Sequence, residues 1–182
     1  MPDERRIAAQ FFWSVDPLGT LTSLALQRIL LGDKVAEAKF GTGQPIEDPR
    51  REQQVLETVE RLATTAGADP FLSVRFFQDQ LEANKIVQRG LHDLWTTYPE
   101  LCPSGPRPDL AREVRPRLDQ ITAEIIEQLV IATSDGAASG EHIADATDGP
   151  AFGTVIRDLD SLHRRALEVA LRSLSTGLRH AR

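Results

Sequence analysis

Asn84 and Gln88 are polar residues at positions where helical periodicity calls for apolar side chains. At about 100° per residue they share an angular sector with Phe77, Leu81 and Trp95. Desolvating an unpaired polar group costs about 2–7 kcal/mol. The two amides therefore either bond to each other, as side chains four residues apart can, or line a cavity for a polar ligand. We favour the cavity.

A second polar cluster, formed by Asp48, Arg51 and Glu52, is in phase with an apolar helix face further along the same segment. Each member also has a simpler interpretation, because Asp48 suits an N-cap and Glu52 suits the positive end of the helix macrodipole. The apolar face with which they align consists of Val55, Val59, Leu62 and Ala66.

Two cations precede this cluster. Arg28 lies in the apolar stripe of the first predicted helix, where an isolated arginine could pack its stem and extend its head into solvent. Lys39 follows in a short segment, and this lysine by itself does not indicate a function. Because polar residues intrude on three helical segments, a shared cavity explains them better than coincidence.

This set offers permanent cations, an uncharged amide donor and a carboxylate acceptor, without a nucleophile–base pair. It fits a small dianionic ligand that carries a hydroxyl group, and it does not fit hydrolysis, metal chemistry or redox chemistry. The single Cys102 excludes an intramolecular disulfide. We expect no metal, because the histidines show no ligand spacing; they are His92, His142, His163 and His180.

The composition is typical of an aliphatic helical protein, with 41% hydrophobic, 5% aromatic and 26% charged residues in 182. The net charge of −6 gives no reason to expect nucleic acid, which needs a basic face. No stretch approaches the roughly 20 apolar residues that span a bilayer, so no membrane partner is expected. Residues 1–17 lack the apolar core of a secretory signal, which predicts a cytoplasmic protein as the chain stands. A chain whose leader had been removed would look the same.

The pattern predicts an all-α, single-domain helical bundle of about five to six helices, with residues 1–17 as an N-terminal extension and 18–182 as the domain. Apolar residues off the main stripe of the longest helix (Phe76, Val87 and Leu94) predict contact with another helix or another subunit. A proline-rich loop is expected at 99–108. The predicted helices are 18–31 ending at Gly32, 33–40 capped by Asp33, 49–66 ending at Gly67, 70–95 capped by Asp69, one from Asp109 or Arg115 to about 133, a short one at 141–146, and 155–178.

Two segments resemble a known family. Residues 45–56 (PIEDPRREQQVL) and 76–88 (FFQDQLEANKIVQ) resemble conserved segments of AroQ-type chorismate mutases, and the gamma subclass is the closer match. The resemblance runs from about residue 18 to 121, with a weaker similarity at 159–167. It implies an all-helical, homodimeric isomerase of aromatic amino-acid biosynthesis. Such an enzyme converts chorismate to prephenate by a cofactor-free [3,3]-sigmatropic rearrangement.

The resemblance also implies roles for the cationic and acidic residues. Arg28 matches the first-helix arginine that binds a substrate carboxylate. Lys39 matches the lysine that reaches the ether oxygen and the enolpyruvyl carboxylate. Asp48, Arg51 and Glu52 match the segment that engages the ring hydroxyl and helps to hold charge, with Asp48 binding substrate and the other two taking part in catalysis.

The remaining roles fall on the later helices. Asn84 stands where the family has a small polar residue near a substrate carboxylate, and Gln88 stands at the second hydrogen-bond donor to the ether oxygen. Arg115 matches a further substrate-binding arginine, although the alignment can slip onto Arg112 or Arg117.

A pericyclic reaction needs neither an acid nor a nucleophile; it needs the two ends of the substrate held in the reactive geometry. Negative charge grows on the ether oxygen as the C–O bond breaks, so donors aimed at that oxygen bind the transition state better than the ground state. Lys39 and Gln88 are the expected donors. Some relatives carry glutamate at the position of Gln88, which donates only when protonated, whereas glutamine donates at any ordinary pH.

Other functions stay open. A 4-amino-4-deoxychorismate mutase or an isochorismate pyruvate lyase would share the fold and differ in the ring substituent that faces Glu52. A non-catalytic helical regulator could keep the pocket to bind a metabolite or a partner helix. Exported gamma-type members usually carry a leader and some carry a disulfide, so export of this chain is the alternative to a cytoplasmic location.

Overall fold

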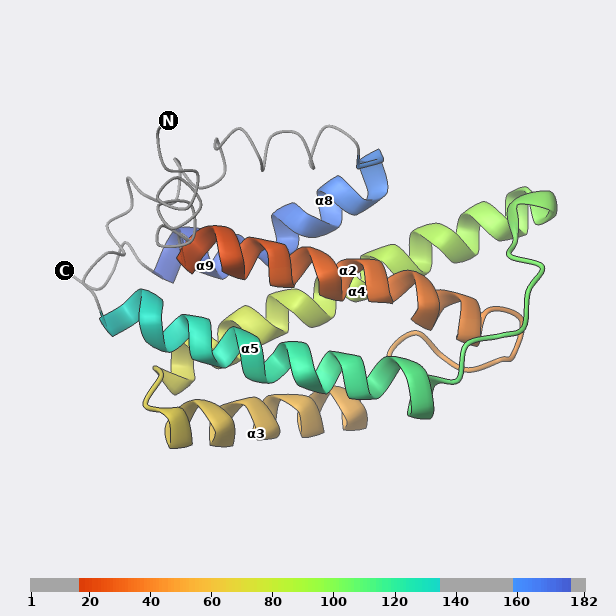
Figure 1. The fold of residues 1–182 in the computed structure, drawn as a ribbon. Coiled ribbons are helices and arrows are strands. Elements are labelled where there is room, and N and C mark those ends of the chain that lie inside the picture. Colours follow the sequence, from red (N-terminus) through yellow and green to blue (C-terminus); the bar gives the residue numbers. More distant parts are fainter. Residues whose placement is uncertain (1–16, 135–158, 178–182) are drawn as a thin grey trace, which may run out of the picture.

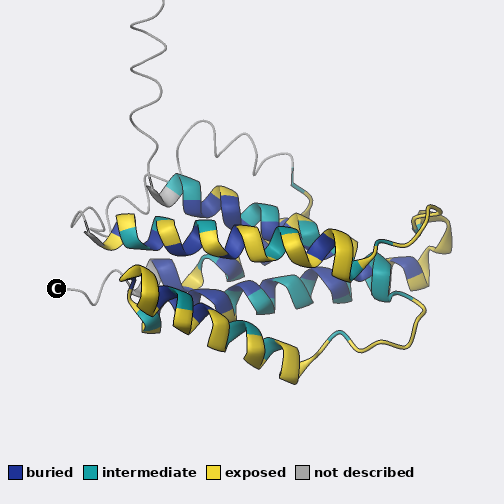
Figure 2. Ribbon diagram, turned by 60° about the horizontal axis from the view of Figure 1, so that its bottom comes forward, coloured by how far each residue is buried: buried dark blue, intermediate teal, exposed yellow. Residues whose placement is uncertain are grey.

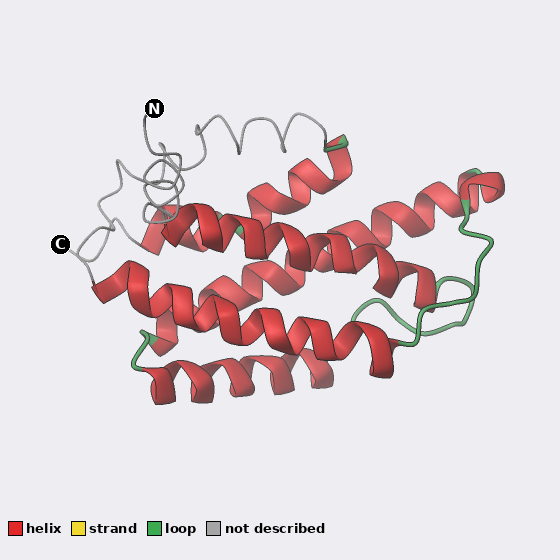
Figure 3. Ribbon diagram, viewed as in Figure 1, coloured by secondary structure: helices red, strands yellow, loops and turns green. Residues whose placement is uncertain are grey.

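The computed structural model describes residues 17–134 and 159–177, and all regular elements within these ranges are helical (Figures 1 and 3). This confirms the predicted all-α class. The short helix predicted at 141–146 and the start of the helix predicted at 155–178 lie outside the described residues. The described α-helices are α2 (Pro17–Lys39), α3 (Pro49–Ala66), α4 (Pro70–Thr97), α5 (Arg115–Ser134), α8 (Ser161–Ala170) and α9 (Arg172–Gly177).

The helices pack around α4, the longest of those described, which contacts α2, α3, α8 and α9. In Figure 1, α5 lies between α2 and α3, and α4 runs obliquely behind α5 and α2. Figure 2 shows dark blue along the middle of α4 and mostly yellow along α3. No described helix combines the length and the apolar character needed to cross a bilayer.

The interior is aliphatic with two phenylalanines at its centre, Phe76 and Phe77, whose rings meet edge to face at 6.0 Å. Burying a large apolar side chain fully contributes about 1.5–3 kcal/mol, so each of these phenylalanines stabilises the fold by an amount of this order. The largest fully buried aliphatic side chains are Leu21, Ile29, Val59, Val87, Ile121, Ile125 and Leu129.

The starts of α3 and α4 follow the predicted capping. Asp48 precedes Pro49 and its carboxylate accepts from the backbone N–H of Arg51 at 3.0 Å, while Asp69 caps α4 in the same way. Gly67 ends α3 in the left-handed conformation, with φ 80°. The cap on α3 matters for the site, because it places Arg51 and Glu52 in the first helical turn.

The predicted helix break at Gly32 is wrong, because α2 runs through this residue without interruption. A Cβ on Gly32 would lie 2.9 Å from Asn84 Nδ2 and 3.4 Å from Val87 Cγ1. The glycine therefore permits close approach of α2 to α4 and does not end a helix. Asp33, predicted as an N-cap, instead contacts His163 of α8.

Of the three off-stripe residues of α4, two are buried and the third, Leu94, is 38% exposed; α8 and α9 of the same chain pack against α4. Phe76 and Val87 are fully buried, which confirms the predicted contact with another helix. Gly90 permits this packing, because a Cβ there would lie 2.5 Å from Leu162 Cδ1. The homodimer stays a prediction that now depends on the family resemblance alone.

The last predicted helix is divided in two near Leu171, between the end of α8 and the start of α9. A contact with α4 accounts for the division: the backbone N–H of Ser173 donates to Asp79 Oδ2 at 2.8 Å. Gln80 Nε2 also donates to the carbonyl oxygen of Ala170 at 3.0 Å. Side chains of α4 thus bind backbone groups of α8 and α9 at this point.

Candidate active site

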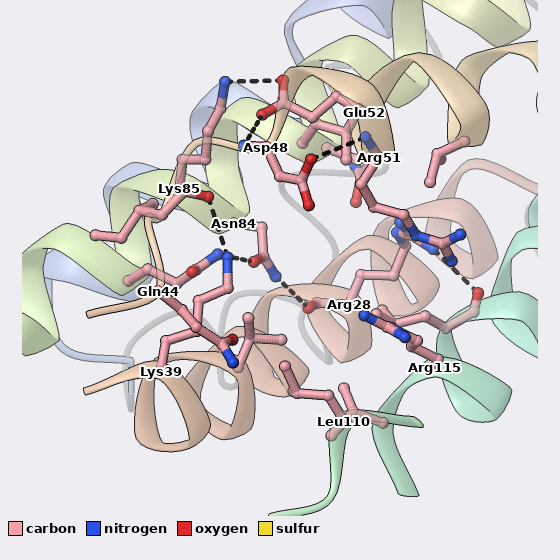
Figure 4. A pocket seen from close by; sticks show the side chains of 18 of the residues that line it. Arg28, Lys39, Gln44, Asp48, Arg51, Glu52, Asn84, Lys85, Leu110 and Arg115 are labelled. Carbon is pink, nitrogen blue, oxygen red and sulfur yellow. Dashed lines mark hydrogen bonds and ion pairs between the residues drawn. The ribbon is translucent and has the colours of Figure 1, made fainter. Parts of the chain in front are cut away.

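A cavity of about 330 Å³ lies among α2, α3, α4 and the start of α5 (Figure 4). Its volume is in the range of small-molecule sites. Residues predicted from four separate segments line the same cavity, so the structure brings the whole predicted set together. They are Arg28, Lys39, Asp48, Arg51, Glu52, Asn84, Gln88 and Arg115.

The lining is positively charged although the whole chain carries a net charge of −6. Five cationic side chains and three carboxylates give the lining a formal charge of +2. A small ligand with two negative charges would find its complement here. The cations are Arg28, Lys39, Arg51, Lys85 and Arg115, and the carboxylates are Asp48, Glu52 and Asp119.

Arg28 is buried, with 8% of its surface exposed. Its Nη1 donates to Thr122 Oγ1 at 2.9 Å and to the carbonyl oxygen of Leu118 at 3.1 Å. The guanidinium also lies over the Phe77 ring, 5.0 Å from its centroid. Burial lowers the pKa of Arg28 to about 10, with Asp119 acting in the opposite direction, so the residue is charged at neutral pH. Its orientation is therefore set by α5 and α4 before any ligand arrives.

Lys39 is partly buried, and its ammonium donates to the carbonyl oxygens of Pro45 at 2.9 Å and Ile46 at 3.2 Å. An ammonium carries three protons, which leaves one for a ligand. Burial lowers the pKa of Lys39, and the carboxylates of Asp48 and Glu47 offset part of that effect. The lysine is thus held by the loop that follows α2.

Asp48 and Arg51 are exposed at the start of α3, although in the sequence they are in phase with an apolar helix face. Glu52 is half-buried; its Oε1 accepts from the Asp48 N–H at 3.4 Å and its Oε2 from Lys85 Nζ at 3.2 Å. Lys85 is only 15% exposed and also pairs with Glu82 of its own helix at 2.7 Å. The ion pair between Lys85 and Glu52 joins α4 to the first turn of α3.

Asn84 and Gln88 satisfy both interpretations of their spacing, because they bond to each other and also line the cavity. Gln88 Nε2 donates to Asn84 Oδ1 at 2.7 Å, and Asn84 Nδ2 donates to the backbone carbonyl of Arg28 at 3.4 Å. Gln88 is 4% exposed. Its Oε1 is buried and has no hydrogen-bond partner within the described part of the chain.

Among the three arginines near the start of α5, Arg115 lines the cavity. Arg112 lies 3.8 Å from Asp109, and Arg117 donates to Gln27 Oε1 at 2.7 Å. Asp109 caps the turn Leu110–Val114, a π-helical turn that leads directly into α5. A helical element therefore begins at each of the two predicted starts, and Arg115 lies where the π-helical turn meets α5.

Five polar or charged lining residues were not predicted as ligands: Gln44, Gln80, Lys85, Asp119 and Thr122. Asp119 and Thr122 lie four and seven residues after Arg115, so helical spacing could have identified them. Gln80 lies four residues before Asn84, so helical spacing could have identified it too. Within the described ranges, no group of three or more His, Cys, Asp or Glu side chains could hold a metal ion.

Comparison with known proteins relates this chain to one family. Residues 20–89 match the family described as chorismate mutase type II. The secreted chorismate mutase of Mycolicibacterium smegmatis is 31% identical over 162 residues, covering 86% of this chain and 85% of that protein. The secreted chorismate mutase of Mycobacterium tuberculosis is 30% identical over 162 residues, covering 88% and 79%.

A solved structure supports the same relationship. The crystal structure of chorismate mutase from Burkholderia thailandensis superposes with a TM-score of 0.75 at 34% identity, covering 87% of this chain and 98% of that one. The similarity therefore extends over most of both chains.

Proposed function

The chain belongs to the chorismate mutase family, and we propose that its cavity isomerises chorismate to prephenate without a cofactor. The observation that carries this proposal is the convergence of Lys39 and Gln88 on one positively charged cavity. The similarity to secreted chorismate mutases supports the assignment to the gamma subclass.

Substrate binding requires cations for two carboxylates. Arg28 is buried and oriented in advance by Thr122 and Leu118, which suits it to one carboxylate. Arg51 and Arg115 are exposed and line the same cavity, so they can close on the other carboxylate from the solvent side. Figure 4 shows Arg28, Arg51 and Arg115 on the side of the cavity opposite Lys39 and Asn84. Holding both carboxylates favours the folded conformation in which the two reacting carbon atoms meet.

The rearrangement itself needs stabilisation of the ether oxygen. Lys39 has a third ammonium proton and Gln88 has a second amide proton, and both residues line the cavity. Donors positioned in advance bind the growing negative charge without reorganisation, and one such donor is worth about 10²–10³ in rate. Lys39 and Gln88 are therefore the proposed catalytic pair.

Asp48 and Glu52 supply acceptors for the ring hydroxyl at the α3 side of the cavity. The ion pair between Glu52 and Lys85 offsets the negative charge of this carboxylate. A neutral hydroxyl would be a better partner for it than an ammonium group, which favours chorismate over its 4-amino-4-deoxy analogue. The presence of all the predicted polar positions likewise favours an enzyme over a non-catalytic regulator.

Location and assembly are further proposals. The two mycobacterial relatives are named as secreted, which supports export of this chain over the cytoplasmic location predicted from its first residues. Residues 1–16 lie outside the described part of the chain. Fractionation of the source cells tests the location, and sedimentation of the purified protein tests the proposed homodimer.

The activity test is to mix the purified protein with chorismate, follow the loss of ultraviolet absorbance and identify the product. We expect prephenate as the product, without release of pyruvate. Pyruvate together with an aromatic acid would indicate a lyase. Absence of conversion above the uncatalysed rate would refute the proposal.

A further inference from the structure

Gly32, Asn84 and Gln88 connect the backbone of α2 to the cavity, and we propose that Asn84 is a positioning residue that fixes the side-chain amide of Gln88 with its N–H groups available to the substrate. The inference depends on the proposed function, since it concerns the donor to the ether oxygen. It gives Asn84 a different role from direct contact with a substrate carboxylate, the role that the family resemblance implies.

The orientation of the Asn84 amide is fixed by a group that can only accept hydrogen bonds. The backbone carbonyl of Arg28 only accepts hydrogen bonds, so the side chain that approaches it at 3.4 Å must present Asn84 Nδ2. Asn84 Oδ1 then faces the opposite way, toward Gln88. Figure 4 shows Asn84 bonded to the Arg28 carbonyl, which lies on α2.

The orientation of Asn84 determines that of Gln88. An oxygen at Asn84 Oδ1 requires a donor, and Gln88 Nε2 meets it at 2.7 Å. The primary amide of Gln88 has two N–H groups, so one stays available when the other is bound to Asn84. Reversal of the amide would place two oxygens against each other and would direct an acceptor toward the charge that develops on the ether oxygen.

Gln88 Oε1 shows that this orientation is imposed on the residue. It is buried without a hydrogen-bond partner among the described residues, an arrangement that lowers stability. The contact with Asn84 supplies the reason, because it holds the nitrogen on the side where a donor is needed.

Gly32 is the third residue of the connection from α2 through Asn84 to Gln88. A Cβ at this position would lie 2.9 Å from Asn84 Nδ2, closer than a methyl group and an amide nitrogen can approach. Nδ2 is the end of a flexible side chain, so the fold can accept an alanine here by moving Asn84. Alanine is also the better residue inside a helix. Gly32→Ala should therefore displace Asn84 while leaving the helix intact.

The kinetic test compares Asn84→Ala, Gly32→Ala, Gln88→Ala and two double variants. We expect Asn84→Ala and Gly32→Ala each to lower kcat about 10- to 100-fold, because small misplacements of a catalytic group have effects of this size, with KM changed less than about threefold. Asn84→Ala combined with Gln88→Ala should be no slower than Gln88→Ala alone. Gly32→Ala combined with Asn84→Ala should be no slower than Asn84→Ala.

The opposite results would overturn the inference. If Asn84 contacts the substrate carboxylate directly, Asn84→Ala should raise KM, and its effect should multiply with that of Gln88→Ala. The thermal midpoint of Gly32→Ala serves as the control for folding, and we expect it to equal or exceed that of the unmodified protein. Unchanged turnover in a well-folded Gly32→Ala protein would also refute the proposed path.

A second measurement does not depend on turnover. The side-chain amide of Gln88 gives a pair of signals in a ¹H–¹⁵N NMR spectrum, assigned by their absence in Gln88→Ala. We expect Asn84→Ala and Gly32→Ala to shift the same signal of this pair, since both break the same hydrogen bond. If the Gln88 signals do not shift in either variant, the inference is overturned. This readout does not require turnover. Failure of the unmodified protein to convert chorismate would refute only the proposed function.

Discussion

His163 Nε2 lies 2.8 Å from Asp33 Oδ1, a contact that joins α8 to α2. The other ring nitrogen lies 2.7 Å from Asp160 Oδ2, so the imidazole has a carboxylate on each side. The contact with Asp33, with a further contribution from Asp160, raises the pKa of His163 to about 9 despite its burial. The imidazole is therefore charged at neutral pH and both of its nitrogens donate.

This contact predicts how stability changes with pH. The folded-state pKa of His163 is above the unfolded value of about 6.5, so its contribution is complete below about pH 6.5 and is lost as the pH rises through about 9. A shift of this size corresponds to at most about 3 kcal/mol. Urea unfolding of the protein and of His163→Gln should show a difference in free energy that shrinks between pH 6 and 9.5. Parallel curves over that range would contradict the prediction.

Lys39→Ala should lower kcat/KM by at least about 10²–10³, because it removes a donor to the ether oxygen. Chorismate consumption measures the effect. Lys34→Ala is the matched control, since this lysine is on the same helix, is 57% exposed and pairs only with Glu37 among the described residues. The assignment fails if Lys39→Ala and Lys34→Ala have similar activity and both fold.

Gln88→Glu should make turnover depend on pH. Glutamine donates at any ordinary pH, so the unmodified protein should show a nearly constant kcat/KM from pH 5 to 8. A glutamate at this position donates only when protonated, so the activity of Gln88→Glu should fall as the pH rises through the pKa of the new carboxyl group. A steep fall in the unmodified protein that Gln88→Glu left unchanged would count against the assigned role.

Arg115→Ala should raise KM for chorismate and lower kcat/KM about 10- to 100-fold, since hydrogen bonds to charged groups are worth about 1.5–3 kcal/mol. Its stability should change by less than about 0.5 kcal/mol, because the residue is exposed. Arg112→Ala is the matched control, three residues away and directed toward Asp109. Equal effects of the two changes would refute the choice of Arg115.

Gly90→Ala should destabilise the protein by about 1–3 kcal/mol, the usual cost of overpacking. Its new Cβ would meet Leu162 Cδ1 at 2.5 Å, and this contact outweighs the better helix propensity of alanine. Chemical denaturation measures the loss. In a Leu162→Ala background, Gly90→Ala should lower the free energy of unfolding by less than it does in the unmodified protein. If the effects of the two changes are additive, the close contact is not the cause.

Much of the fold could be predicted because the signals are local. Asp48 with Pro49, Asp69 with Pro70, and Gly67 mark helix ends by the chemistry of adjacent residues, and the structure confirms each of them. The errors come from distant contacts. Gly32 suggests a helix end in sequence, yet the reason for a glycine there is Asn84, which is far away along the chain.

The candidate site was predictable for a related reason. Polar side chains on apolar helical faces are conspicuous, and the cavity includes all eight residues named from the sequence. Lys85 was missed because its partner Glu52 lies on another helix, so spacing along the chain does not show the ion pair. Gln44 follows a glycine-containing turn, where no periodicity relates it to the other lining residues.

The cavity is lined by residues from Arg28 to Thr122, and α8 and α9 pack behind it against α4. Engineering can exploit this division. Random libraries confined to residues 159–177 should chiefly alter heat tolerance, whereas those confined to 28–122 should also alter turnover and substrate preference. Improvements found separately in the two regions should combine well where the exchanged residues lie apart, and should interact where the regions meet, as at His163 with Asp33 or Leu162 with Gly90.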